Sequence, residues 1–62
     1  MKVISPRERA LRLVDMFKYD HGDEAKEVAI NHSKDMLEYV KEQNDVFRIS
    51  YNEQVIKELE KL

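Results

Sequence analysis

The chain has 62 residues, with 11 basic and 13 acidic side chains, a formal net charge of −2 and no cysteine. This length fits one domain, and the lack of cysteine excludes disulfides and cysteine-based zinc sites. No apolar run has the length of a membrane span or a signal peptide, so we expect a cytoplasmic protein.

The charges are spread unevenly along the chain. Residues 1–22 carry a net charge of +2, residues 23–45 carry −4, and residues 46–62 are balanced. A protein that binds a nucleic-acid duplex usually concentrates positive charge on one face. Because the most acidic segment here is also the longest predicted element, binding to nucleic acid is not favoured.

The first predicted helix spans approximately residues 6–21. Ser5 and Glu8 have the spacing of a capping box, and Pro6 stands at the first helical position. Gly22 suits the left-handed position just past the helix end. The apolar residues recur at helical spacing and form one inward stripe. This stripe consists of Ala10, Leu13, Val14, Phe17 and His21.

The second predicted helix spans approximately residues 23–43. Ile30 and Leu37 lie to one side of its main apolar stripe, so the apolar arc covers about half of the helix. A helix with so wide an arc contacts two neighbours, and Ala25 and Ala29 would permit close approach of the first helix. The main stripe consists of Ala25, Val28, Ala29, His32, Met36, Tyr39 and Val40.

Residues 44–50 alternate apolar and polar side chains, which predicts an extended linker whose Phe47 or Ile49 covers the core. Ser50 and Glu53 have the spacing of a second capping box. A third helix is predicted over residues 51–62. Its inward residues are Val55, Ile56, Leu59 and Leu62. The predicted fold is therefore all-α: a single domain, residues 1–62, that forms a small three-helix bundle with a long central helix and a short C-terminal helix.

Three blocks of the sequence resemble a known group of proteins. They are RALRLVDMF from Arg9, AKEVAI from Ala25 and VIKELEKL from Val55. In this order they are similar to "KAKELVDKF", "AKQCAL" and "VKKEIEKL" of short helical reading frames in bacteriophages and prophages of Bacteroidetes-type hosts. The sequence departs from that pattern at Asn52, where tryptophan is frequent, and at Val28, where cysteine is frequent. The resemblance implies an origin in a mobile element and assigns no functional residue.

Residue types that carry chemistry are present but lack the required spacing. If the first two helices are antiparallel, His21 and His32 lie roughly 16 Å apart along the axis, so they should not share a metal within one subunit. A partly buried histidine is the expected role, and a pH-sensitive contact of His32 across an oligomer interface is the alternative. The sequence has no nucleophile motif and no glycine-rich phosphate loop. We therefore expect no catalytic residue, no cofactor, no metal ligand and no enzymatic activity.

Two surfaces are candidates for binding. Arginine, methionine and tyrosine are enriched in protein interfaces, and they recur nearly opposite the core stripe of the first helix, as Arg9, Arg12, Met16 and Tyr19. The alternative is an ordinary exposed face. Small natural domains without disulfides often gain stability by association with a second subunit, so we expect a homo-oligomer. The candidate oligomer surface consists of Ile30, Leu37, Phe47 and Tyr51.

These observations favour a non-enzymatic, phage-type helical interaction protein that forms homo-oligomers, binds a host or viral protein, or does both. An alternative is an oligomer that sequesters a nucleotide signal. In that case Arg9 and Arg12 would hold a phosphate group and Tyr19 would stack on the base. A third is a helix-turn-helix regulator that binds DNA, which the acidic residues of the third predicted helix disfavour.

Overall fold

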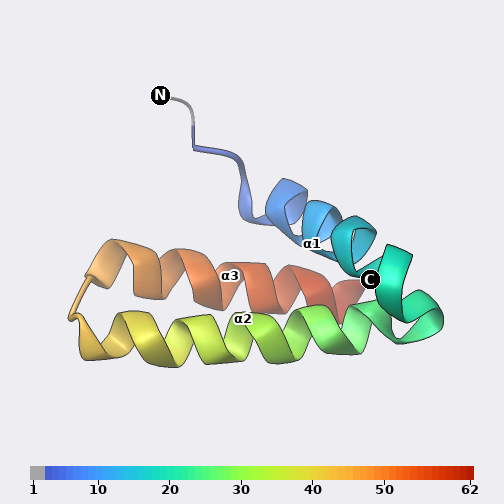
Figure 1. The fold of residues 1–62 in the computed structure, drawn as a ribbon. Helices are drawn as coiled ribbons and strands as arrows, with labels where there is room; N and C mark the ends of the chain where they lie inside the picture. The colour runs from blue at the N-terminus through green and yellow to red at the C-terminus, as the bar shows by residue number, and fades with distance from the viewer. Residues whose placement is uncertain (1–2) are drawn as a thin grey trace.

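The computed structural model describes residues 3–62, which form α1 (Pro6–His21), the short 3-10 helix η1 (Gly22–Glu24), α2 (Ala25–Glu42) and α3 (Val46–Lys61) (Figure 1). No strand occurs in these residues, so the all-α prediction is confirmed. The prediction of a short C-terminal helix is wrong, because α3 has 16 residues, the same length as α1, and α2 has 18.

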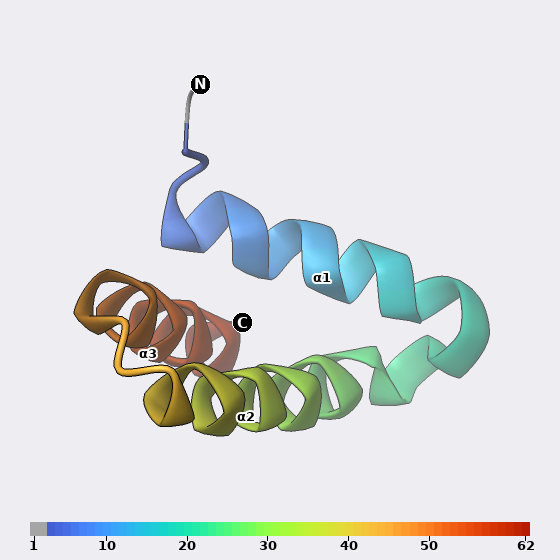
Figure 2. The same ribbon diagram turned by 60° about the vertical axis from the view of Figure 1, so that its left-hand side comes forward.

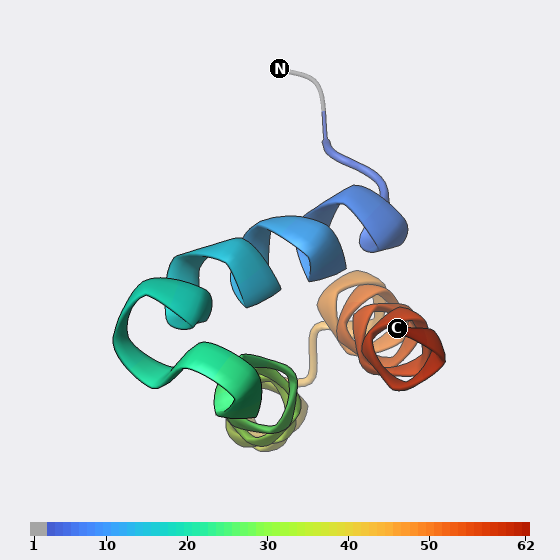
Figure 3. The ribbon, with the colours of Figure 1, turned by 90° about the vertical axis from the view of Figure 1, so that its right-hand side faces the viewer.

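The helices α2 and α3 form an antiparallel hairpin, and α1 crosses one face of this pair at an angle (Figures 1 and 2). Seen along the hairpin, α1 lies across both helices (Figure 3). Each of the three helices packs against the other two. As the wide apolar arc of α2 predicts, this helix contacts two neighbours, α1 and α3. None of the helices in the described residues has the length and apolar composition needed to cross a membrane.

The ends of α1 follow the sequence prediction. The Ser5 hydroxyl accepts a hydrogen bond from the backbone N–H of Glu8 at 3.2 Å, which satisfies one of the free donors at the helix start. The Glu8 carboxylate pairs with Arg12 at 2.9 Å instead of reaching back to the cap. Gly22 follows the helix with a φ of 56°, a conformation that glycine adopts without steric cost.

The predicted linker over residues 44–50 is wrong, because α3 already begins at Val46. The Asp45 side chain caps this helix by accepting a hydrogen bond from the N–H of Arg48 at 3.2 Å. Asn44 takes a left-handed φ of 60°, which asparagine tolerates, so a very short turn reverses the chain. Ser50 and Glu53 therefore lie inside α3 and form no cap. Phe47 is 67% exposed and does not cover the core.

The core lies where the three helices meet. Its buried cluster consists of Ala10, Leu13, Ala29, Val55 and Leu59, and the half-buried Val14, Phe17, Ile30 and Tyr51 pack against it. The apolar stripe predicted for α1 is confirmed except at its last residue, because His21 is exposed. Leu62, predicted to face inward, is also exposed.

The buried face of α2 is rotated from the predicted stripe. It consists of Ala25, Ala29, Ser33 and Val40. Within the predicted stripe, His32, Met36 and Tyr39 are exposed. The rotation is toward the side of Ile30 and Leu37, where Leu37 lines a hollow together with Ile56 of α3. Ser33 is buried by this rotation, although nothing in the apolar pattern predicts it.

Candidate functional site

The four residues of the candidate partner surface are exposed, as predicted, but they do not converge. Tyr19 is 94% exposed and lies in the last turn of α1. Arg12 forms an ion pair with Glu8 on the preceding turn. Arg9 alone lines a hollow, together with residues of α2 and α3. Arg9 therefore lies at the edge of α1 that faces the hairpin. The helical spacing predicted a position nearly opposite the core, so for Arg9 this prediction is wrong.

The residues of the candidate oligomer surface do not form one surface. Ile30 and Tyr51 pack against the core cluster. Leu37 lines a hollow between α2 and α3 that Ile56 shares, whereas Phe47 and Tyr51 line another hollow beside the N-terminal segment. The sequence pattern could not show that these residues lie on different surfaces, because their placement depends on where α3 begins.

The strongest candidate site is the hollow at Arg9, which we call the arginine hollow. It has a volume of about 350 Å³ and lies where the N-terminal segment and α1 meet the hairpin. Its lining consists of Val3, Ile4, Arg9, Met36, Val40, Arg48, Tyr51 and Asn52. Two features set its chemistry: an apolar floor and two guanidinium groups at the rim.

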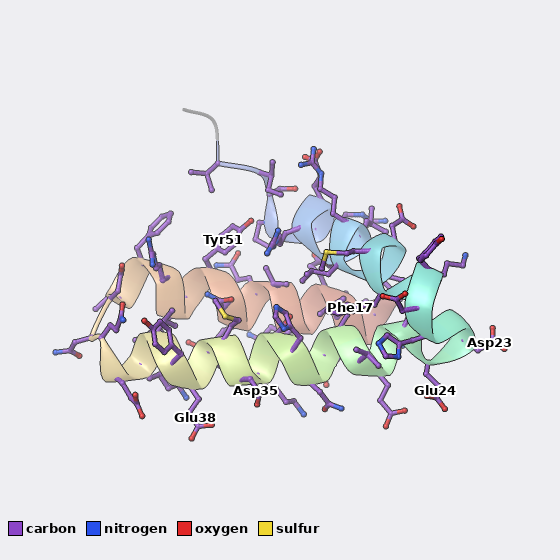
Figure 4. The ribbon with its side chains drawn as sticks, viewed as in Figure 1. Phe17, Asp23, Glu24, Asp35, Glu38 and Tyr51 are labelled. Atoms are coloured by element: carbon purple, nitrogen blue, oxygen red, sulfur yellow. The ribbon has the colours of Figure 1, made fainter. Side chains whose placement is uncertain are left out.

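The apolar part of the arginine hollow comes from three segments. Val40 of α2 is buried, and Met36 one turn earlier is 42% exposed. The Tyr51 hydroxyl donates a hydrogen bond of 2.8 Å to the backbone oxygen of Ile4. This bond fixes residues 3 and 4 against α3, so the segment before α1 forms one wall of the hollow. Figure 4 shows Tyr51 on the side of α3 that faces this segment.

The charges of the arginine hollow have one sign. Among the described residues, those that line it include Arg9 and Arg48 and no carboxylate. Arg48 contacts Asp45 through Nε at 3.5 Å, but its side chain remains 64% exposed. The Asn52 side chain donates a hydrogen bond to the backbone oxygen of Arg48 at 2.8 Å, which holds Asn52 against the preceding turn of α3. Such a surface fits an apolar or aromatic side chain flanked by carboxylates.

A second hollow, of about 300 Å³, adjoins the first and shares Val3, Ile4 and Tyr51 with it. Phe47 lies over Tyr51 with nearly parallel rings and a centroid distance of 6.5 Å. No charged side chain lines this hollow in the part of the chain that the structure describes. Exposed apolar surface of this kind is typical of contact sites. It extends the apolar surface of the arginine hollow past the N-terminal segment.

The two histidines flank Phe17 of α1, His21 from the same helix and His32 from α2. The ring centroid of Phe17 lies 6.0 Å from that of His21 and 5.5 Å from that of His32. Both histidines are exposed, so the expected partial burial is wrong. Within residues 3–62, no group of three or more histidine and carboxylate side chains is arranged to hold a metal ion.

The acidic side chains of η1 and α2 point to solvent. Figure 4 shows Asp23 and Glu24 at the end of the molecule where α1 joins α2, and Asp35 and Glu38 along the outer edge of α2. All four are exposed. They form a solvated face, and Asp23 and Glu24 lie at the end of the molecule far from Tyr51.

Sequence reasoning missed half of the arginine hollow. The sequence pattern predicts Arg48 in a linker and Met36 in the core stripe, so it groups neither with Arg9. The signal that could have identified them is Asp45, a good capping residue three positions before Arg48. A helix begun there brings Arg48 and Asn52 to one face of α3.

No known protein family, curated protein or solved structure matches this chain. The resemblance to short phage reading frames therefore stays a prediction.

Proposed function

We propose that this three-helix domain is a non-enzymatic interaction module of phage type that self-associates, and that binds a host or viral protein through the same kind of contact. The observation that carries the proposal is the arginine hollow with the apolar hollow beside it. Met36 and Phe47 are large apolar side chains left 42% and 67% exposed at these hollows. Methionine, aromatic residues and arginine are the types that interfaces favour.

The size of the core also supports association. Among residues 3–62, only eight apolar residues are buried, and three of these are alanine. The eight are Ala10, Leu13, Ala25, Ala29, Val40, Val55, Ile56 and Leu59. A domain of about 60 residues buries a small share of its surface and is correspondingly marginal in stability. Covering exposed methionine and phenylalanine with a second subunit adds apolar burial that one chain lacks.

The other two functions are less well supported. A phosphate held between Arg9 and Arg12 requires both guanidinium groups at one site, but Arg12 pairs with Glu8 and does not line the hollow. A recognition helix that binds DNA requires an excess of positive charge. Three basic and three acidic residues lie on α3, so we do not propose that role.

Sedimentation equilibrium over a range from ten to several hundred micromolar tests the proposal. We expect the mean mass of the wild-type protein to rise with concentration above 7.4 kDa. Arg9→Glu should weaken association by about tenfold or more, because it reverses a charge at the rim of the contact. Arg7→Glu is the matched control: it makes the same charge change on α1, but Arg7 lines a different hollow, so association should be unchanged.

A wild-type mass that stays at one chain across the whole range would contradict self-association. Equal effects of Arg9→Glu and Arg7→Glu would show that net charge, and not the arginine hollow, controls the association.

A further inference from the structure

The molecule has two ends of complementary chemistry. One carries the arginine hollow, and the other, where α1 joins α2, carries Tyr19, Asp20, Asp23 and Glu24, which we call the acidic end. All four residues are exposed. Figure 4 shows Asp23 and Glu24 far from Tyr51, which lines the hollow, along the longest dimension of the molecule. That dimension is 34 Å, so one chain cannot place its own acidic end in its own hollow.

The acidic end carries an exposed aromatic ring, and three carboxylates follow it in the chain. Among the large apolar side chains that the structure describes, Tyr19 has the highest exposed fraction, 94%. Asp20 follows it at the end of α1, Asp23 and Glu24 lie past Gly22 in η1, and Lys18 is the one cation adjacent to Tyr19 in the chain. In the described part of the chain, the ion pairs join Arg12 to Glu8, Arg48 to Asp45 and Lys61 to Glu58. The carboxylates of the acidic end take part in none of them.

The arginine hollow has the positive charge and the apolar surface that can receive the acidic end. A tyrosine ring can pack against the thioether of Met36 and under a guanidinium group, while the neighbouring carboxylates face Arg9 and Arg48. A symmetric dimer centred on the hollow would instead bring the arginines of two copies together, and like charges placed opposite one another cost association free energy. The charges therefore favour contact between unlike ends.

Resting on the proposed self-association, we infer that the arginine hollow of one copy receives Tyr19 and the carboxylates of the acidic end of a second copy, head to tail. Such a contact is heterologous, so each bound copy leaves one hollow and one acidic end open. Association then continues beyond the dimer into chains or closes into a ring. A standard interface buries about 800 Å² per partner, a large share of this chain's 4918 Å² surface, so we expect a smaller, weaker contact.

Two variants, each with one damaged end, test the head-to-tail contact. The hollow variant is Arg9→Glu, which keeps the acidic end. The acidic-end variant is Tyr19→Ser combined with Asp23→Asn, which keeps the hollow. These side chains are exposed, so both variants should fold, and circular dichroism checks that they do. Sedimentation velocity is then measured on each variant alone, on their equimolar mixture and on the wild type, with Arg7→Glu as the control.

We expect the wild type and Arg7→Glu to form species larger than a dimer at high concentration. Each damaged variant alone should associate at least about tenfold more weakly. The mixture should form a one-to-one dimer with an affinity close to that of a single wild-type contact, because it contains one intact hollow and one intact acidic end, and it should grow no further.

Three results would overturn the inference in distinguishable ways. A wild type that associates but stops at the dimer would indicate a two-fold contact. A mixture that stays monomeric while the wild type associates would place the contact elsewhere. A wild type that stays monomeric would remove the proposed self-association as well. If added inorganic phosphate then shifts the Arg9 Nε resonance of the monomer, the hollow belongs to a small anion.

Discussion

The Tyr51 hydroxyl donates a hydrogen bond of 2.8 Å to the backbone oxygen of Ile4. Within the described residues, this bond fixes the N-terminal segment against α3. We expect Tyr51→Phe to lower the free energy of unfolding by about 0.5–1.5 kcal/mol, since the ring packing stays and the donor is lost. Urea denaturation measures this. Tyr39→Phe is the control, because Tyr39 is 55% exposed, and its unfolding should not change. Equal effects of the two substitutions would mean that the bond does not stabilise the segment.

Gly22 joins α1 to η1 with φ 56° and ψ −122°, a backbone conformation that side chains with a Cβ rarely adopt. No atom lies within 4 Å of a Cβ built at this position, so any cost of substitution comes from the backbone. We expect Gly22→Ala to destabilise the fold by about 1–3 kcal/mol in thermal or urea unfolding. Asn44→Gly, at the other positive φ, should change stability by about 0.5 kcal/mol or less. A neutral Gly22→Ala would show that the connection adopts another backbone conformation.

At the scale of the helices, the start of α3 decides which residues share a surface. Asp45→Ala removes the acceptor for the Arg48 N–H, and we expect a loss of about 0.5–2 kcal/mol in unfolding free energy. Ser50→Ala is the contrasting variant, because Ser50 is exposed and lies inside the helix. It should leave stability unchanged or raise it slightly, since alanine is the better helix former. The opposite ranking would place the helix start at residue 51.

The same helix start explains how much could be predicted from the sequence. The start and end of α1 and most of its inward stripe follow from local signals: Ser5, Pro6 and Gly22 have no strong local competitors. At α3, Asp45 and Ser50 each precede a plausible helix, and the alternation of residues 46–49 favoured the later one. Local propensity does not decide between them; the packing of a longer α3 along α2 does.

The candidate site was predictable only in part for the same reason. Arg9 is identified by its spacing on α1, but its neighbours in the hollow come from two other helices and from the segment before α1. Met36 has the spacing of a core residue and is left half exposed because α1 crosses the hairpin at an angle (Figure 2). A crossing angle depends on which side chains meet at the contact, and a single apolar stripe does not specify it.

For the molecule as a whole, the distribution of charge matters more than the net charge of −2. The basic rim of the arginine hollow and the carboxylates at the α1–α2 connection lie toward opposite ends. Exposed charges of this kind steer association and are screened by salt, with a Debye length of about 10 Å at 0.1 M and about 3 Å at 1 M. Self-association through these ends should therefore weaken as the salt concentration rises, whereas a purely apolar contact would not.

Small-angle X-ray scattering across a concentration series tests the central claim, self-association, most directly. At infinite dilution the radius of gyration should approach that of a single chain, whose Cα atoms give 11.5 Å. We expect this radius to rise with concentration in 0.05 M salt and to fall back toward the single-chain value in 1 M salt. A radius that stays constant from the lowest to the highest concentration at low salt would contradict the proposal that this domain self-associates.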